Sequence, residues 1–262
     1  MLTFEMSKRY KGTGISNGLD RGMLVYQNGD LLLDEGMGMG SLALQSGGMN
    51  YFASIKQITN SSDSGRVEVT LSVDRMLQRT IYGIPSKPLT RFIEKVCTNM
   101  YKEREQGQGI WFVIGGWINF VLQIKVDFVP VPSKGIFQLS NEILKNEVRI
   151  ELSGNLEEAA DKIFVMNELS GRLFDHGMIN DKITPPPLGW QKTAKGSRLY
   201  SAERGLTFTA DEIGKPDNLS TQLYWGREAD KDHCWAGFIY ELQTKSKSFQ
   251  KFQYSILFQE RG

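Results

Sequence analysis

Short runs in which apolar and polar residues alternate recur along the chain, separated by segments rich in Gly, Pro, Asn, Asp and Ser. Alternation with a period of two places apolar side chains on one face of a β-strand and polar side chains on the other. Many short strands joined by turns indicate an all-β sandwich or barrel. The runs lie at residues 22–27, 30–35, 50–58, 66–74, 118–128, 135–140, 147–153, 162–169, 206–211, 221–225, 235–243 and 252–259.

We therefore predict a mainly β fold, either a large antiparallel β-sandwich of the supersandwich kind or two fused barrel-like sheets. Residues 241–259 resemble the closing strands of the galactose-mutarotase type of supersandwich. The resemblance covers this short stretch only and includes no catalytic motif, so it assigns no family. No linker clearly divides the chain. We expect residues 1–262 to form a single β-rich domain, with 130–155 as the place for any subdivision.

Residues 88–105 depart from the strand pattern. Leu89 and Val96 belong to an apolar stripe with helical spacing, and the other face carries charged residues such as Arg91 and Glu94. This pattern predicts one surface α-helix over 88–105. A second, shorter helix is expected to begin at Asn155, because Asn is a favoured N-cap and Glu158 stands three residues later.

The strongest local signal is the Asn28-Gly29 pair between two apolar runs, which predicts a type I′ hairpin turn. The second strand is expected to continue from residue 30 to about residue 44. Simple alternation then places Asp34, Gly36, Gly38 and Gly40 on one face, and Met37 and Met39 on the other.

The shared face of these glycines has three interpretations. A neighbouring side chain lies over the bare backbone or the strand bends there, a ligand approaches the backbone beside Asp34, or the glycines form a mobile loop. A nucleotide-binding loop is disfavoured. The third glycine comes one residue too early for a dinucleotide fingerprint, and no Gly-Lys-Ser/Thr sequence follows.

Charge and composition exclude several classes of function. The 31 basic and 30 acidic residues give a net charge of +1 and do not form blocks, so no nucleic-acid partner is expected. The chain begins without an apolar signal region and contains no membrane-spanning run, so no membrane partner is expected. Cys97 and Cys234 are expected to be reduced thiols of a cytoplasmic protein. With His176 and His233 they do not show zinc-site spacing, so neither a metal nor a cofactor is predicted.

The scarce histidines are the first candidates for chemistry. His176 lies in a predicted turn beside Asp175, and His233 follows Asp232 in a charged segment. Histidine can give or take a proton near neutral pH when a carboxylate orients it. We predict His176 or His233 as the acid–base residue and Glu203, Asp232 or Glu241 as its carboxylate partner.

Aromatic residues recur beside polar ones in the second half of the chain. Trp190, Trp225 and Trp235 are predicted to form a ring platform, with Arg227 and Asp34 as polar contacts of a ligand. The competing interpretation is that these rings simply fill a β core.

Three functions remain open, and the sequence does not decide whether the protein is an enzyme. The first is a small-molecule-binding β protein that modifies a carbohydrate by epimerase or lyase chemistry, using histidine and a carboxylate. The second is a lipocalin-like container, hydratase or cyclase for an apolar isoprenoid or lipid. The third is a non-enzymatic interaction module.

Overall fold

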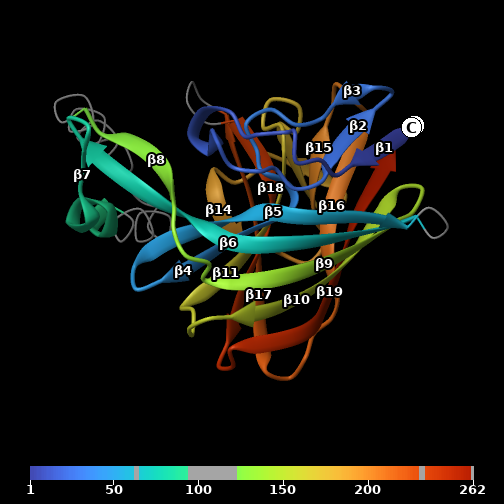
Figure 1. Cartoon of the computed structure of the whole chain (residues 1–262). Coiled ribbons are helices and arrows are strands. Elements are labelled where there is room, and N and C mark those ends of the chain that lie inside the picture. The colour runs from blue at the N-terminus through green and yellow to red at the C-terminus, as the bar shows by residue number, and fades with distance from the viewer. Residues whose placement is uncertain (62–64, 94–122, 230–233, 261–262) are drawn as a thin grey trace.

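The computed structural model describes residues 1–61, 65–93, 123–229 and 234–260 (Figure 1). Strands dominate this part of the chain, as predicted. The strands are β1 Leu2–Glu5, β2 Leu24–Gln27, β3 Asp30–Leu31, β4 Gly38–Ser46, β5 Met49–Ser61, β6 Arg66–Ile81, β7 Ile84–Pro85, β8 Lys125–Pro130, β9 Gly135–Ile143, β10 Glu147–Leu156, β11 Lys162–Leu169, β12 His176–Ile179, β13 Lys182–Thr184, β14 Gly189–Lys192, β15 Ser197–Ser201, β16 Leu206–Gly214, β17 Leu219–Ala229, β18 Cys234–Thr244 and β19 Ser248–Glu260. A 3₁₀ turn, η1, covers Gly14–Ser16.

Sixteen of the described strands form one sheet, in the order β13-β12-β15-β16-β19-β10-β9-β6-β5-β4-β11-β18-β17-β14. Strands β7 and β8 both pair with the far part of β6. The paired strands run antiparallel, which confirms the predicted fold class. The sheet curls, so that β6, β9 and β10 lie in front of β16, β17 and β18 (Figure 1).

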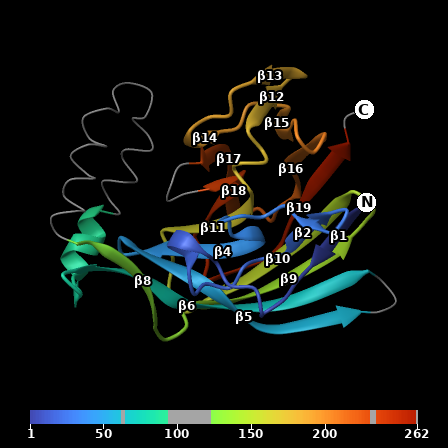
Figure 2. The ribbon, with the colours of Figure 1, turned by 90° about the horizontal axis from the view of Figure 1, so that it is seen from above.

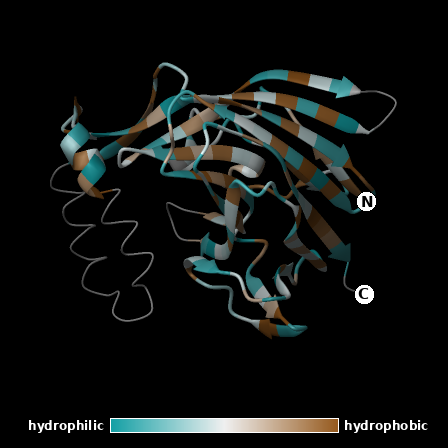
Figure 3. Cartoon of the chain, turned by 90° about the horizontal axis from the view of Figure 1, so that it is seen from below, coloured by the Kyte–Doolittle hydropathy of each residue, from teal (hydrophilic) through white to brown (hydrophobic). Residues whose placement is uncertain are grey.

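Alternation along the strands explains why the sheet has two chemically different faces. In β9, Phe137 and Leu139 are buried whereas Ile136 and Gln138 are exposed. Figure 3 shows the resulting bands of hydrophobic and hydrophilic residues along the long strands. The buried set forms the main hydrophobic cluster, and we call the sheet face that carries it the core face. The other side of the sheet is called the second face.

Large aromatic side chains fill the space inside the curled sheet. Tyr240, Tyr254 and Phe208 are among the fully buried residues of the core face. The two ends of the sheet also meet there: a side chain at Gly177 of β12 would lie 3.0 Å from the ring of Trp225 on β17. The resulting arrangement resembles a sandwich whose layers belong to one continuous sheet.

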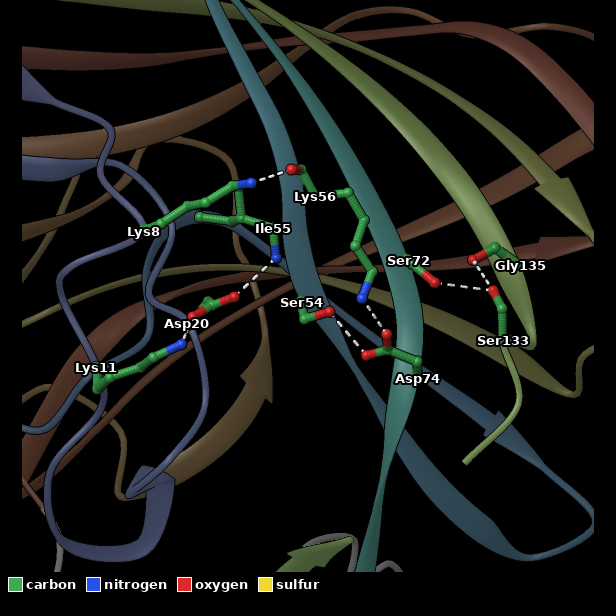
Figure 4. Close-up of polar contacts among 10 residues, drawn as sticks. All are labelled: Lys8, Lys11, Asp20, Ser54, Ile55, Lys56, Ser72, Asp74, Ser133 and Gly135. Carbon is green, nitrogen blue, oxygen red and sulfur yellow. Dashed lines mark hydrogen bonds and ion pairs between the residues drawn. The ribbon is translucent and has the colours of Figure 1, made fainter. Parts of the chain in front are cut away.

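The N-terminal segment forms a separate three-stranded sheet, β1-β2-β3, that covers part of the core face. Asp20 holds this segment against the large sheet, because its carboxylate accepts a hydrogen bond of 2.8 Å from the Ile55 amide and pairs with Lys11 (Figure 4).

Within the large sheet, Ser54 of β5 donates a hydrogen bond of 2.7 Å to Asp74 of the neighbouring strand β6 (Figure 4).

The Asn28-Gly29 hairpin is confirmed, with φ of 53° and 91° at the two turn residues. The expected long second strand is wrong. β3 ends at Leu31, a turn follows, and β4 starts only at Gly38. Simple alternation fails as well, because Met39 pairs with Asn167 and Ser41 pairs with Met166, which leaves Gly40 as an extra residue.

Gly40 therefore forms a β-bulge with a φ of +71°. Its amide donates a hydrogen bond of 3.1 Å to the side-chain oxygen of Asn167. The bulge resets the alternation, so that Met39 and Leu42 both face the core. Neighbouring groups lie against the glycines: the Leu139 side chain against Gly40 and the backbone of residues 22–23 against Gly38.

Two helix predictions have different outcomes. A helix begins at residue 87, one residue before the predicted start, and the rest of the predicted range after residue 93 lies outside the described residues. The short helix at Asn155 is wrong, because Asn155 lies in β10 and pairs with both Ile136 and Ser248. Strand pairing on both sides supplies backbone hydrogen bonds that outweigh a local capping preference. Of the predicted strand 118–128, only the part from residue 123 is described.

Candidate functional site

One cross-strand row on the second face joins Trp190 to Glu168. Trp190 of β14 pairs with Gly226 of β17, Gly226 pairs with Gly237 of β18, and Gly237 pairs with Glu168 of β11. Residues paired in this way place their side chains on the same face of a sheet. The two central residues of the row, Gly226 and Gly237, have no side chains. No side chain of this row therefore lies between Trp190 and Glu168.

The central glycines are required by close approach of the backbone. A side-chain carbon at Gly226 would lie 1.9 Å from the carbonyl oxygen of Gly189, and one at Gly237 would lie 2.3 Å from that of Asn167. Both distances are shorter than any van der Waals contact. Neighbouring strands are thus drawn together at this point, and any larger residue would force them apart.

Two tryptophans stack at one end of the row. The ring centroids of Trp190 and Trp235 are 4.0 Å apart, with an angle of 13° between the ring planes. Trp190 also packs against a second hydrophobic cluster, which includes Met37, Met166 and Ile239. Both rings are only partly buried, so this apolar surface remains accessible at the tryptophan pair.

Glu168 places a carboxyl group on this largely apolar surface. The residue is 7% exposed, and one carboxyl oxygen accepts a hydrogen bond of 2.8 Å from the Met37 amide. Burial raises the pKa of Glu168 from 4.5 to about 7, and the Met37 hydrogen bond opposes part of that rise. The acid and its carboxylate are therefore both populated near neutral pH, which suits proton transfer.

An ion pair marks the edge of the site where the chain crosses from β3 to β4. The Asp34 carboxylate lies 2.5 Å from the Arg172 guanidinium. Burial raises the pKa of the neighbouring Cys234 thiol, and its hydrogen bond with Asp34 adds to the rise. The Cys234 thiol is thus held in its protonated, unreactive form.

Of the predicted ligand contacts, Trp190 and Trp235 come together on the second face and Asp34 lies at the edge. Trp225 and Arg227 have their side chains on the core face instead. Trp225 is buried there, and Arg227 donates a hydrogen bond of 2.6 Å to the Gly171 carbonyl oxygen. The predicted platform of three tryptophans is therefore a stacked pair, with the third ring in the core.

The predicted catalytic residues are dispersed. His176 begins β12, with its Nδ1 atom 2.7 Å from Asp175. Glu203 lies in an exposed turn next to Arg204. Glu241 shares the second face with Glu168, but it pairs with Lys162 at 2.8 Å. Asp232 and His233 lie outside the described residues.

Glu168 was missed by the sequence analysis, although a signal was present. The two faces of β11 are both apolar, with Ile163 and Val165 on one and Phe164 and Met166 on the other. Glu168 lies on the same face as Phe164 and Met166, so it is expected to be buried. Burial raises the pKa of a carboxyl group.

Two hollows are also present. One of about 10 Å³ lies beside Gly40 and has room for about one water molecule. The other, of about 480 Å³, opens on the second face over β9, β10 and β19. Charged residues of both signs line it, including Glu142, Arg149 and Glu151, and Arg149 pairs with Glu147 at 2.9 Å.

Within the described residues, no group of three or more His, Cys, Asp or Glu side chains is arranged to hold a metal ion. The described helix is too short and too polar to cross a bilayer. No protein-family model and no curated protein matches the sequence.

Proposed function

We propose that the protein binds a mainly apolar small molecule against Trp190 and Trp235, and that Glu168 exchanges a proton with this ligand. The observation that carries the proposal is a buried carboxyl group with a pKa near 7 on the same sheet face as a stacked tryptophan pair. Carboxyl groups of surface ion pairs keep their charge at neutral pH, whereas this one can act as an acid.

The chemistry that fits these groups best is hydration or cyclisation of a carbon–carbon double bond. The Glu168 proton would form a new C–H bond with the π electrons of the double bond, which leaves a cation on the other carbon. The faces of Trp190 and Trp235 favour a positive charge. Water, or a second double bond of the ligand, would supply the next electron pair, and the proton then released would return to the carboxylate.

A carbohydrate ligand is the second candidate, and the hollow of about 480 Å³ favours it, because its polar lining can bond hydroxyl groups. Two residues predicted for a carbohydrate site, His176 and Trp225, do not join the tryptophan pair. The His176 side chain forms a hydrogen bond with Asp175. The Trp225 side chain lies on the core face, opposite to the face that carries Trp190 and Trp235.

The test begins with a thermal-shift screen of isoprenoids, fatty acids and monosaccharides. We expect an apolar compound to raise the melting temperature of the wild type. Trp190→Ala or Trp235→Ala should weaken its binding by about tenfold or more, since each removes a large ring contact. Exposed Glu203→Gln is the control and should bind as the wild type does.

Two carboxylate variants then separate binding from chemistry. Glu168→Gln should retain the ligand but lose turnover, because the amide has no acidic proton. Glu241→Gln is matched to it, since Glu241 is also a carboxylate of the second face. A monosaccharide shift that survives both tryptophan substitutions, or turnover that depends on Glu241 and not on Glu168, would overturn the proposal.

A further inference from the structure

A projecting arm is the most unusual surface of the described chain. It consists of the far end of β6, β7 and the helix at residues 87–93, and it extends to one side of the sheet (Figures 1 and 2). Three large apolar side chains are mostly exposed on it: Tyr82 at 58%, Ile84 at 70% and Phe92 at 64%. Single exposed apolar residues are common, but three on one short arm indicate a contact surface.

Hydrogen bonds hold the turn and the helix of the arm together. The buried Thr90 hydroxyl accepts a bond of 2.9 Å from the Arg79 amide of β6 and donates one of 2.9 Å to the Ser86 carbonyl oxygen. The Ser86 amide in turn donates to the Arg79 carbonyl oxygen at 3.0 Å. Because Thr90 faces β6, Phe92, two residues further along the helix, points away from it. These hydrogen bonds hold the helix and the turn of the arm in fixed positions relative to β6.

The tip of the arm has an unfavourable local conformation. Tyr82 and Gly83 both have positive φ, at 50° and 79°, between paired residues Ile81 and Ile84. The same kind of turn elsewhere in the chain uses Asn28, which tolerates positive φ better than an aromatic residue does. A tyrosine at this position therefore costs backbone energy that an asparagine or glycine would avoid.

The described arm carries basic residues and no acidic ones, although Asp74 directly precedes it and Glu94 directly follows it in the sequence. Residues 75–93 contain Arg75, Arg79, Lys87 and Arg91 and no Asp or Glu, although the whole chain is nearly neutral. Lys87 and Arg91 are both exposed on the helix of the arm. On the adjoining strand β8, the charged residues are Lys125 and Asp127.

We propose that this arm docks on the surface of an anionic lipid bilayer, with Tyr82, Ile84 and Phe92 entering the headgroup region. Exposed apolar side chains flanked by Lys and Arg are typical of surfaces that insert shallowly, and tyrosine favours the membrane interface. Basic residues add attraction to anionic lipids. Peripheral binding of this kind needs no helix that spans the bilayer, and none occurs among the described residues. The inference stands independently of the proposed ligand site.

The experiment is co-sedimentation of the full chain with phosphatidylcholine vesicles that contain or lack phosphatidylserine. We expect binding to the anionic vesicles and loss of binding at high salt. Ile84→Ser/Phe92→Ser should reduce the affinity by about tenfold or more. Ile183→Ser/Leu188→Ser removes two similarly exposed apolar residues from outside the arm and should leave binding unchanged.

A second pair of substitutions keeps the test valid if the apolar variant folds poorly. Lys87→Glu/Arg91→Glu leaves the apolar residues in place and should lower the affinity for anionic vesicles by about tenfold or more. Three results would overturn the inference: no sedimentation of the wild type with either vesicle, equal binding to both vesicles, or equal losses in the arm variants and the Ile183/Leu188 control.

Discussion

At the scale of single residues, Glu168 makes the stability of the fold depend on pH. Its pKa is about 7 in the folded chain, against an ordinary value of 4.5. Between these values the unfolded chain releases the proton while the folded chain keeps it, so the free energy of unfolding falls as pH rises. Above about pH 7 both states are ionised and the decrease levels off.

Glu168→Gln should remove this component of the pH dependence. We expect the stability of the variant relative to wild type to rise by up to about 3 kcal/mol from about pH 4 to about pH 8. Urea unfolding of both proteins across that range measures the difference. A parallel pH dependence in the two proteins would show that Glu168 titrates normally and is not the acid that the site requires.

At the scale of elements, β4 shows both what the sequence predicts and where prediction fails. The hairpin at Asn28 follows from local turn chemistry. Residues 38–44 form a strand as expected, but both of their faces are buried, so alternation does not show which residues share a face. The bulge at Gly40 depends on the side chain of Asn167, which is remote in sequence. Glycine permits a bulge, but only the partner strand determines which glycine forms it. The pairing of Glu168 with Gly38 could not be predicted for the same reason, because it depends on which strand lies beside β4.

A pair of glycine substitutions tests the bulge. Gly40→Ala adds the strain of a side chain at φ +71° to a contact of 2.8 Å with Leu139. We expect a loss of about 2–4 kcal/mol in the free energy of unfolding. Gly47→Ala is the matched control, since its φ is +56° and nothing lies within 4 Å of the added carbon; it should cost about 1 kcal/mol. Equal losses would mean that the site beside Leu139 is not closely packed.

At the scale of the whole molecule, sequence periodicity predicts the fold class but not the order of strands. Alternation indicates which residues of a strand share a face, whereas strand order depends on contacts such as β4 with β11 and β6 with β9. The predicted site residues separate for the same reason. Trp190 and Trp235 meet because β14, β17 and β18 are neighbours. Trp225 directly precedes Gly226 in β17, so its side chain lies on the opposite face, in the core.

The proposed function depends most directly on where a ligand binds. The decisive measurement is a crystal structure with the compound that gives the largest thermal shift in the screen. We predict electron density on the second face, in contact with the Trp190 and Trp235 rings and within hydrogen-bond or van der Waals distance of Glu168. Density confined to the charged hollow around Arg149, with the tryptophan pair untouched, would contradict the account.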